Sequence, residues 1–248
     1  MRYFFEVAYK GTDFHGWQSQ KNANSVQSTI EKCCSLQLRE DIKIVGSGRT
    51  DTGVHCQQQY FHADINQPIN NDEFLYSINS FLPNSIVIRA IHQVNEGAHA
   101  RFDAYERSYE YRISRVPDPF LMGMAWMFYR PLDVDGMNKA AELLIGEQDF
   151  ESFSKVKTDV NTFICNVKQA RWIEQGNILT FHVTANRFLR GMVRALTGTL
   201  IDVGEGKISV GDFKDILLAR DRKRAGAAAP AGGLFLVSVK YPEDIIKQ

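Results

Sequence analysis

The chain has 248 residues with 29 acidic and 29 basic side chains, so its formal net charge is zero. This length suits one large or two ordinary domains, and a hydrophobic content of 44% is enough for a buried core. Zero net charge gives no overall argument for a nucleic-acid partner, so any such argument must come from local clusters. No apolar run approaches the roughly 20 residues that a membrane-spanning helix needs, and residues 1–9 have the pattern of a strand rather than a signal peptide. We therefore expect a folded cytoplasmic protein without a membrane partner.

The first half of the chain alternates strand and helix patterns. Residues 2–9 are rich in aromatic and β-favouring side chains, and a glycine-containing turn follows at 10–16. Apolar residues at helical spacing follow Ser25, which can serve as an N-cap. The predicted elements are strand 2–9, helix 25–38, strands 42–46 and 59–65, helix 71–83 ending at Pro83, and strand 85–94.

The second half repeats this theme after a hinge expected at residues 95–102. Its predicted elements are strand 107–114, helix 133–147, strands near 163–174 and 177–185, helices 187–203 and 209–219, and strand 234–241. The stretch 224–233 is rich in Ala and Gly and is expected to be a close-packed loop. The pattern predicts an α+β protein of two related domains, residues 1–100 and 101–248, with antiparallel mixed sheets flanked by helices.

Cysteine and histidine spacing does not favour a metal site. The cysteines include an adjacent pair and no C-x-x-C, so we expect reduced thiols rather than disulfides or a zinc knuckle. None of the six histidines forms an H-x-x-x-H pair, and His55 and His62 are expected to be structural. The cysteines are Cys33, Cys34, Cys56 and Cys165.

The glycine-rich stretch GSGRTDTG at residues 46–53 does not match the nucleotide-binding motifs. It lacks G-x-G-x-x-G spacing, and where a P-loop would continue with Lys and Ser or Thr it continues with Val54 and His55. No G-x-S-x-G elbow accompanies the serines of the chain. Asp51 in this stretch is therefore either a turn residue or a nucleophile, and the residues alone leave both interpretations open.

A wider comparison of motifs points to one family. GRTDTGVH at residues 48–55 resembles the G-R-T-D-A-G-V-H signature of tRNA pseudouridine synthases of the TruA type. The resemblance extends along the whole chain in the family's order. Similar segments are YKGTDFHGWQSQ (9–20), SVQSTIE (25–31), HARFDAYERSYEYRI (99–113), NRFLRGMVRALTGTLIDVG (186–204) and DRKRAGAAAPAGGLFLVSVKYP (221–242).

The resemblance implies the pseudouridine synthase fold, with an active-site cleft between the two domains. It implies isomerisation of uridine to pseudouridine in the anticodon stem-loop of tRNA, at tRNA positions 38, 39 and 40, by a homodimer without cofactor or metal. Asp51 would be the nucleophile, Arg194 would pair with its carboxylate, and Arg49 would help to displace the target nucleotide. Tyr109, rather than Tyr111, would stack on the target base. Leu234 would line the uracil pocket.

Clustered arginines predict the RNA-binding surface. Arg187, Arg190 and Arg194 would share one helix face if that segment is helical, and phosphate contacts from such patches supply affinity without base specificity. Arg222 belongs to a second cluster at 220–224. A third cluster consists of Arg101, Arg107, Arg112 and Arg115.

The chain departs from the family pattern in places. Thr52 and Cys56 replace alanine, Gln148 replaces histidine, and residues 154–172 differ most, which affects the expected tRNA contacts. Three alternatives remain open: a pseudouridine synthase with other RNA positions, a noncatalytic RNA-binding protein of the same fold, and a hydrolase that uses Asp51 with Asp13 or Asp103.

Overall fold

The computed structural model describes residues 1–156 and 161–246. The chain divides into two compact units, Met1–Glu106 with Phe235–Gln248, and Arg107–Leu234, each with its own strands and helices. Each unit is described below by itself. The expected domains, 1–100 and 101–248, differ from these units at residues 101–106 and 235–248, because the last strand pairs within the unit that contains the N-terminus.

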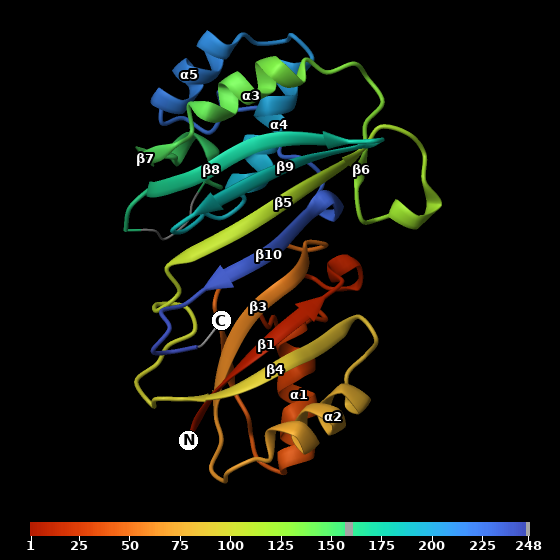
Figure 1. Ribbon diagram of the computed structural model, residues 1–248, viewed down its shortest axis with the longest axis vertical. Helices are drawn as coiled ribbons and strands as arrows, with labels where there is room; N and C mark the ends of the chain where they lie inside the picture. Colours follow the sequence, from red (N-terminus) through yellow and green to blue (C-terminus); the bar gives the residue numbers. More distant parts are fainter. Residues whose placement is uncertain (157–160, 247–248) are drawn as a thin grey trace. The chain divides into compact units, whose positions relative to one another are not determined.

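The first unit has a mixed sheet in the order β4 (Ile86–Val94), β1 (Arg2–Tyr9), β3 (His55–Asp64) and β10 (Leu234–Lys240) (Figure 1). β1 is antiparallel to β3 and β4, whereas β10 is parallel to β3 through Phe235 opposite His55. The short β2 (Ile44–Gly46) also pairs with β3. Helices α1 (Val26–Leu38) and α2 (Asn71–Phe81) complete the unit, and Ser25 caps α1 as predicted.

Aromatic side chains form much of this unit's core. Phe5 of β1 stacks on Phe61 of β3 with 4.9 Å between the ring centroids, and Phe74 of α2 packs on Phe5. All three side chains are buried. The alternation of side chains along β1 therefore directs Phe5 to the helices, while its neighbour Phe4 faces the opposite side of the sheet and stacks on His62.

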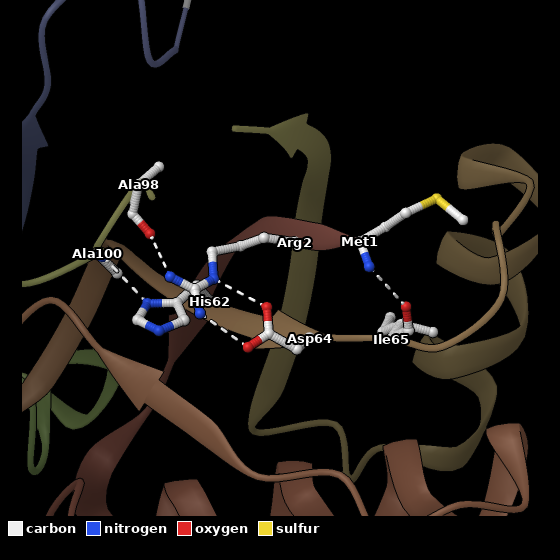
Figure 2. A network of polar contacts seen from close by, with 7 residues as sticks. All are labelled: Met1, Arg2, His62, Asp64, Ile65, Ala98 and Ala100. Carbon is white, nitrogen blue, oxygen red and sulfur yellow. Dashed lines mark hydrogen bonds and ion pairs between the residues drawn. The ribbon is translucent and has the colours of Figure 1, made fainter. Parts of the chain in front are cut away.

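The segment expected to be a hinge is held against this opposite face (Figure 2). The guanidinium group of Arg2 donates to both carboxylate oxygens of Asp64, at 2.9 and 2.7 Å, and to the Ala98 carbonyl oxygen at 2.9 Å. The Ala100 N–H donates to Nδ1 of His62 at 3.1 Å. Because burial and the nearby Arg2 lower the pKa of His62 to about 4, this nitrogen is available as an acceptor at neutral pH, and His62 has the structural role that was predicted.

The second unit has an antiparallel sheet in the order β5 (Glu106–Ser114), β9 (Ile178–Ala185), β8 (Ile164–Gln175) and β7 (Gly146–Asp149). The short β6 (Trp126–Met127) runs parallel to β5. Helices α3 (Val134–Glu142), α4 (Met192–Gly204) and α5 (Val210–Leu218) lie together on one side of this sheet (Figure 1). Nearly every residue of α4 is buried, which makes it the central helix of this layer.

Two predicted helices have different bounds in the structure. The helix expected at 187–203 begins only at Met192, because Gly191 precedes it with a left-handed φ of +72°. The prediction that Arg187, Arg190 and Arg194 share a helix face is therefore wrong, since only Arg194 is in α4. The helix expected at 133–147 ends at Glu142, and Gly146, with φ +101°, begins β7. Residues 157–160 of the divergent segment 154–172 lie outside the described residues.

Candidate active site

Arg49 and Asp51 lie on the loop between β2 and β3. Asp51 is half-buried, between Thr50, which is buried, and Thr52, which is exposed. The Val54 N–H donates to the Asp51 carbonyl oxygen at 3.1 Å, and Gly53 takes a left-handed φ of +77° in the turn that this bond closes. Asp51 is therefore part of a tight turn, as one of the two sequence interpretations expected, but a turn does not exclude a second role for its side chain.

The loop is attached to the strands beneath it by side chains of β1 and β3. The hydroxyls of Tyr9 and Thr50 are hydrogen-bonded at 2.8 Å, and Tyr9 also donates to Oε1 of Gln59 at 3.3 Å. The Gln59 amide nitrogen donates to the Gly48 carbonyl oxygen at 3.3 Å. The two hydrogen bonds of Tyr9 are buried and that of Gln59 to Gly48 is partly buried, so the residue immediately before Asp51 is fixed to the core of the unit.

The turn at residues 10–17, which includes the short helix η1 (Gly11–Asp13), holds the loop from the other side. The Trp17 N–H donates to the Thr50 carbonyl oxygen at 3.2 Å, and the Gly53 N–H donates to the Phe14 carbonyl oxygen at 3.3 Å. Gly16 has φ +87°, and a Cβ atom there would lie 2.5 Å from the Thr50 carbonyl oxygen. The close approach of the two main chains therefore requires glycine at this position.

His55 has a structural role next to the same loop, as predicted. Its Nδ1 accepts a hydrogen bond from the Gly11 N–H at 3.1 Å, and its ring stacks on Phe235 with 4.7 Å between the centroids. Cys56 follows it and is buried, and burial raises the pKa of its thiol. The thiol that replaces alanine here is consequently a packing group rather than a reactive one.

In the second unit, Tyr109 and Tyr111 differ in their surroundings. Tyr109 is half-buried, and its ring meets that of Phe188 edge to face, with 5.1 Å between the centroids. Tyr111 is fully buried and donates through its hydroxyl to the Pro230 carbonyl oxygen at 2.7 Å. Tyr111 is therefore a core residue, as expected, and Tyr109 is the more accessible of the two.

Arg194 lies in the first turn of α4 and is half-buried. Its Nε donates to the Ala229 carbonyl oxygen at 2.7 Å, and the Ala229 N–H donates to the Arg194 carbonyl oxygen at 2.9 Å. The Gly226 N–H donates to Oγ1 of Thr199 further along the helix at 3.0 Å. The 224–233 stretch is thus a loop packed along α4, as predicted, and it fixes the orientation of the Arg194 side chain.

The remaining arginines, which were predicted to contact RNA, differ in their exposure and in their contacts within the protein. Arg190 is exposed and Arg187 is half-buried, both in the loop before α4. Arg222 donates through Nη1 to the carbonyl oxygens of Ala225 and Gly226 at 3.2 and 3.0 Å, so it supports the 224–233 loop. In the third cluster, Arg112 pairs with Glu110 at 2.7 Å.

Two further residues were singled out from the sequence. Leu234 is buried at the start of β10. Gln148, where the family pattern has histidine, donates through its amide nitrogen to the carbonyl oxygens of Leu143 and Ile145 at 2.8 and 3.0 Å. Gln148 therefore satisfies carbonyl groups at the end of α3.

Comparisons with known proteins agree with this arrangement of motifs. The family model described as tRNA pseudouridine synthase matches residues 7–103 and 140–242. A tRNA pseudouridine synthase A of Porphyromonas gingivalis is 46% identical over 248 residues, which cover 98% of this chain and 98% of the relative. One of Bacteroides fragilis is 43% identical and covers 99% of this chain and 98% of the relative. The chain belongs to the tRNA pseudouridine synthase A family.

Membership makes the protein an isomerase with the pseudouridine synthase fold. Asp51, Arg194 and Leu234 fall within the matched residues, whereas Tyr109 falls in the unmatched stretch between them. Within residues 1–156 and 161–246, no helix is both long and apolar enough to cross a membrane, and no three His, Cys, Asp or Glu side chains gather as a metal site would need.

Several residues that position the candidate groups were not identified from the sequence. Tyr9, Trp17 and Gln59 hold the Asp51 loop, and Phe188 contacts Tyr109. The sequence marks these positions only as polar or aromatic residues that lie within a strand or next to a family motif. Core aromatic residues give the same pattern, so it does not distinguish a positioning residue from a core residue.

Proposed function

We propose that the protein isomerises uridine to pseudouridine in the anticodon stem-loop of tRNA, at tRNA positions 38, 39 and 40, with Asp51 as the nucleophile. The Asp51 loop is the observation that carries this proposal. The residue before Asp51 is buried and hydrogen-bonded from two sides, while the residue after it is exposed. A nucleophile must be held still and also be reached by its substrate, and this loop meets both requirements.

The reaction needs no reagent beyond the enzyme and RNA. The bond between N1 of uracil and C1′ of the ribose breaks, the uracil turns, and C5 forms a bond to C1′. The proton lost from C5 is matched by one gained at N1, so atoms and electrons balance. In the proposed mechanism the Asp51 carboxylate adds to either the sugar or the base and is released once the new carbon–carbon bond has formed.

We assign the supporting roles by family resemblance. Tyr109 stacks on the flipped base, a contact worth about 1–3 kcal/mol, which offsets much of the few kcal/mol spent on flipping. The edge-to-face contact with Phe188 supports this role, because it restricts the Tyr109 ring. Arg194 pairs with the Asp51 carboxylate, and the hydrogen bond from its Nε to Ala229 supports a fixed orientation. Arg49, which is exposed, displaces the target nucleotide.

The same resemblance leads us to propose two related domains with a cleft between them, a homodimer, and a uracil pocket lined by Leu234. Arg187, Arg190 and Arg222 are proposed to contact tRNA phosphates. The exposure of Arg190 supports this role for that residue. The internal hydrogen bonds of Arg222 favour an indirect role through the 224–233 loop.

Pseudouridine mapping on unmodified tRNA transcripts tests the proposal without any added cofactor. We expect the wild type to convert anticodon-arm uridines, and Asp51→Asn to bind the same tRNA within about twofold while converting none. Asp13→Asn is the matched control, because Asp13 is an exposed carboxylate on the neighbouring turn. It should retain full activity.

The alternatives give different results in the same assay. Conversion at other uridines would indicate a different position specificity. Release of free uracil, lost in Asp51→Asn and in either Asp13→Asn or Asp103→Asn, would indicate a hydrolase. If the wild type and Asp51→Asn bind tRNA equally well and neither converts any uridine, the protein is a noncatalytic RNA-binding member of the fold.

A further inference from the structure

The loop at residues 224–233, which packs along α4, has few anchoring side chains of its own. Residues 225–229 are alanine and glycine, so no side chain there extends beyond a methyl group. Ala227 and Ala228 are exposed, and a cavity of about 170 Å³ borders residues 227–230. Packing of its own side chains therefore gives this main chain little support, and its position depends on hydrogen bonds from other elements.

Tyr111 of β5 supplies one of these hydrogen bonds. It is fully buried, and its hydroxyl donates to the Pro230 carbonyl oxygen at 2.7 Å. A Cβ atom at Gly233 would lie 2.7 Å from Cζ of Tyr111, so the main chain of the loop also packs directly on the ring. Pro230 follows Ala229, whose carbonyl oxygen accepts from Nε of Arg194 at 2.7 Å. The Tyr111 hydroxyl thus fixes the peptide unit next to the one that binds the Arg194 guanidinium group.

Thr199 of α4 holds the same loop nearer its start. Its side chain is buried, and Oγ1 donates to the Ala195 carbonyl oxygen at 2.8 Å and accepts from the Gly226 N–H at 3.0 Å. Thr197 is also buried in α4 and donates to the Val193 carbonyl oxygen at 2.8 Å. The two threonines therefore match in burial and in their bond within the helix, and the bond to Gly226 belongs to Thr199.

The position of the Ala229 carbonyl oxygen determines where the charge of Arg194 lies. A guanidinium group is planar and rigid, so fixing one nitrogen sets the directions of the other two. Nε donates to Ala229, and the proposed ion pair with the Asp51 carboxylate therefore has to use Nη1 or Nη2. A displacement of about 1 Å in a catalytic group can lower a rate on the order of 100-fold. The groups that hold the loop consequently bear on the proposed reaction.

The protonation state of Tyr111 is suited to a permanent donor. Burial raises the pKa of its hydroxyl above the ordinary value, and the positive charge of Arg194 opposes this shift. Arg194 is therefore close enough to act on the hydroxyl electrostatically. Because the hydroxyl keeps its proton at neutral and acidic pH, any change in a pH profile over that range has to come from another group.

We propose that Tyr111 and Thr199 are positioning residues for Arg194, on which they act through the main chain of residues 226–230. The inference rests on the proposed pairing of Arg194 with the Asp51 carboxylate, and it adds two residues of the second unit to that function. Neither residue touches the substrate. Tyr111 combines a ring that belongs to the core with a hydroxyl that serves the active site.

Single-turnover pseudouridine formation on unmodified tRNA transcripts, measured with the full-length protein from about pH 4 to about pH 8, tests the proposal. Tyr111→Phe removes the hydroxyl and keeps the ring. We expect it to bind tRNA as the wild type does and to convert uridine about tenfold more slowly at neutral pH. A carboxylate that loses a nearby cation binds a proton at higher pH, so the acid limb of the rate should also move up by about half a pH unit.

Tyr241→Phe is the matched control for this change. Tyr241 is buried, and its hydroxyl donates to the carbonyl oxygen of Ala100 in the first unit. The control should lose stability to a similar extent, measured by urea unfolding, while its rate and pH profile stay those of the wild type. This comparison separates a positioning role from a general loss of stability.

The two threonines provide a second pair of variants, which covers the case in which Tyr111→Phe does not fold. Replacement by valine keeps the shape of the side chain and removes the hydroxyl. Thr199→Val should slow the reaction and move the acid limb in the same direction as Tyr111→Phe. Thr197→Val should leave both unchanged.

A double-mutant cycle shows whether Tyr111 acts through Arg194. Arg194→Lys keeps the positive charge but has no counterpart of the Nε–H that donates to Ala229. In this background the loop no longer orients the charge, so adding Tyr111→Phe should change the rate by less than about twofold. A tyrosine with a merely structural role would instead lower the rate by the same factor in both backgrounds.

The possible failures are distinguishable. If Tyr111→Phe and Thr199→Val keep the wild-type rate and pH profile, the inference is overturned, while the activity of the wild type still supports the proposed function. An equal loss of activity in Tyr241→Phe, or an undiminished effect of Tyr111→Phe in Arg194→Lys, would also overturn it. An inactive wild type would overturn the proposed function itself, together with this inference.

Discussion

The substitution Gly16→Ala should damage the Asp51 loop without touching any reacting group. A Cβ atom at residue 16 would lie 2.5 Å from the Thr50 carbonyl oxygen, 3.1 Å from the Asp51 carbonyl carbon and 3.2 Å from the Thr52 nitrogen. All three are main-chain atoms, so no flexible side chain can move aside. The loop itself has to shift, and with it the residue proposed to attack the substrate.

Two contributions set the size of the effect. The left-handed φ of +87° costs a residue with a Cβ atom about 1–2 kcal/mol, and forcing a methyl group against the loop adds roughly 1–3 kcal/mol. We therefore expect a loss of about 2–5 kcal/mol in the free energy of unfolding. A displacement of about 1 Å in a catalytic group can lower the rate on the order of 100-fold, so we expect the rate of pseudouridine formation to fall by at least tenfold.

Gly176→Ala separates the two contributions. Gly176, in the turn between β8 and β9, also has a left-handed φ, +59°, but a Cβ atom there would have no neighbour within 4 Å. It should lose only about 1–2 kcal/mol and keep its activity. Urea unfolding and single-turnover pseudouridine formation measure both quantities. Equal destabilisation of the two variants, with Gly16→Ala fully active, would refute the argument that Gly16 positions the loop.

Two further predictions concern buried titratable groups. The pKa of His62 is about 4, below its ordinary value of 6.5, because burial and Arg2 disfavour its charged form. The unfolded chain therefore binds a proton at higher pH, and stability should decrease by about 1–2 kcal/mol, after allowance for solvent screening, as the pH falls from about 6.5 to 4. His62→Asn retains an acceptor for the Ala100 N–H and should show a smaller change in the urea midpoint between pH 7 and 4.5 than the wild type does. If the midpoint of the variant changes with pH as much as that of the wild type, protonation of His62 is not the cause of the lost stability. Burial raises the pKa of Cys34 to about 12 and that of Cys165 to about 11, and it also raises that of Cys56, so iodoacetamide at pH 8 should leave the native enzyme unmodified and active. Mass spectrometry checks this result, and modification of Cys56 with loss of activity would count against it.

The sequence predicted elements best where a local signal marked their ends. Ser25 and Ser209 each form a capping box with the residue three places later, so α1 and α5 begin where expected. α4 lacks such a cap. Its N-cap is Gly191, and the apolar and basic pattern continues through the preceding loop. Periodicity alone therefore extended the predicted helix by more than a turn and placed Arg187 and Arg190 on it.

Pairing between distant segments could not be predicted from local pattern. The start of β3, His55-Cys56-Gln57-Gln58, alternates poorly because His55 and Cys56 point to opposite faces of the sheet and both are buried. β10 pairs with a strand about 180 residues earlier, so its membership in the first unit depends on tertiary contacts. Similarly, the sequence shows that Arg112, Arg115 and Arg222 are basic but not that each already has an acceptor within its own unit.

The way the Asp51 loop is held also restricts how the proposed reaction can begin. Thr50 is bound through its side chain to Tyr9 and through its main chain to Trp17, while Gly53 is bound to Phe14. Moving Asp51 by several ångströms toward a base inside an RNA stem would break buried hydrogen bonds on both sides of the loop, at about 1–3 kcal/mol for each group left unsatisfied. Flipping one nucleotide costs a few kcal/mol and is offset by stacking on an aromatic ring. In the proposed reaction it is therefore the nucleotide, and not the nucleophile, that has to move.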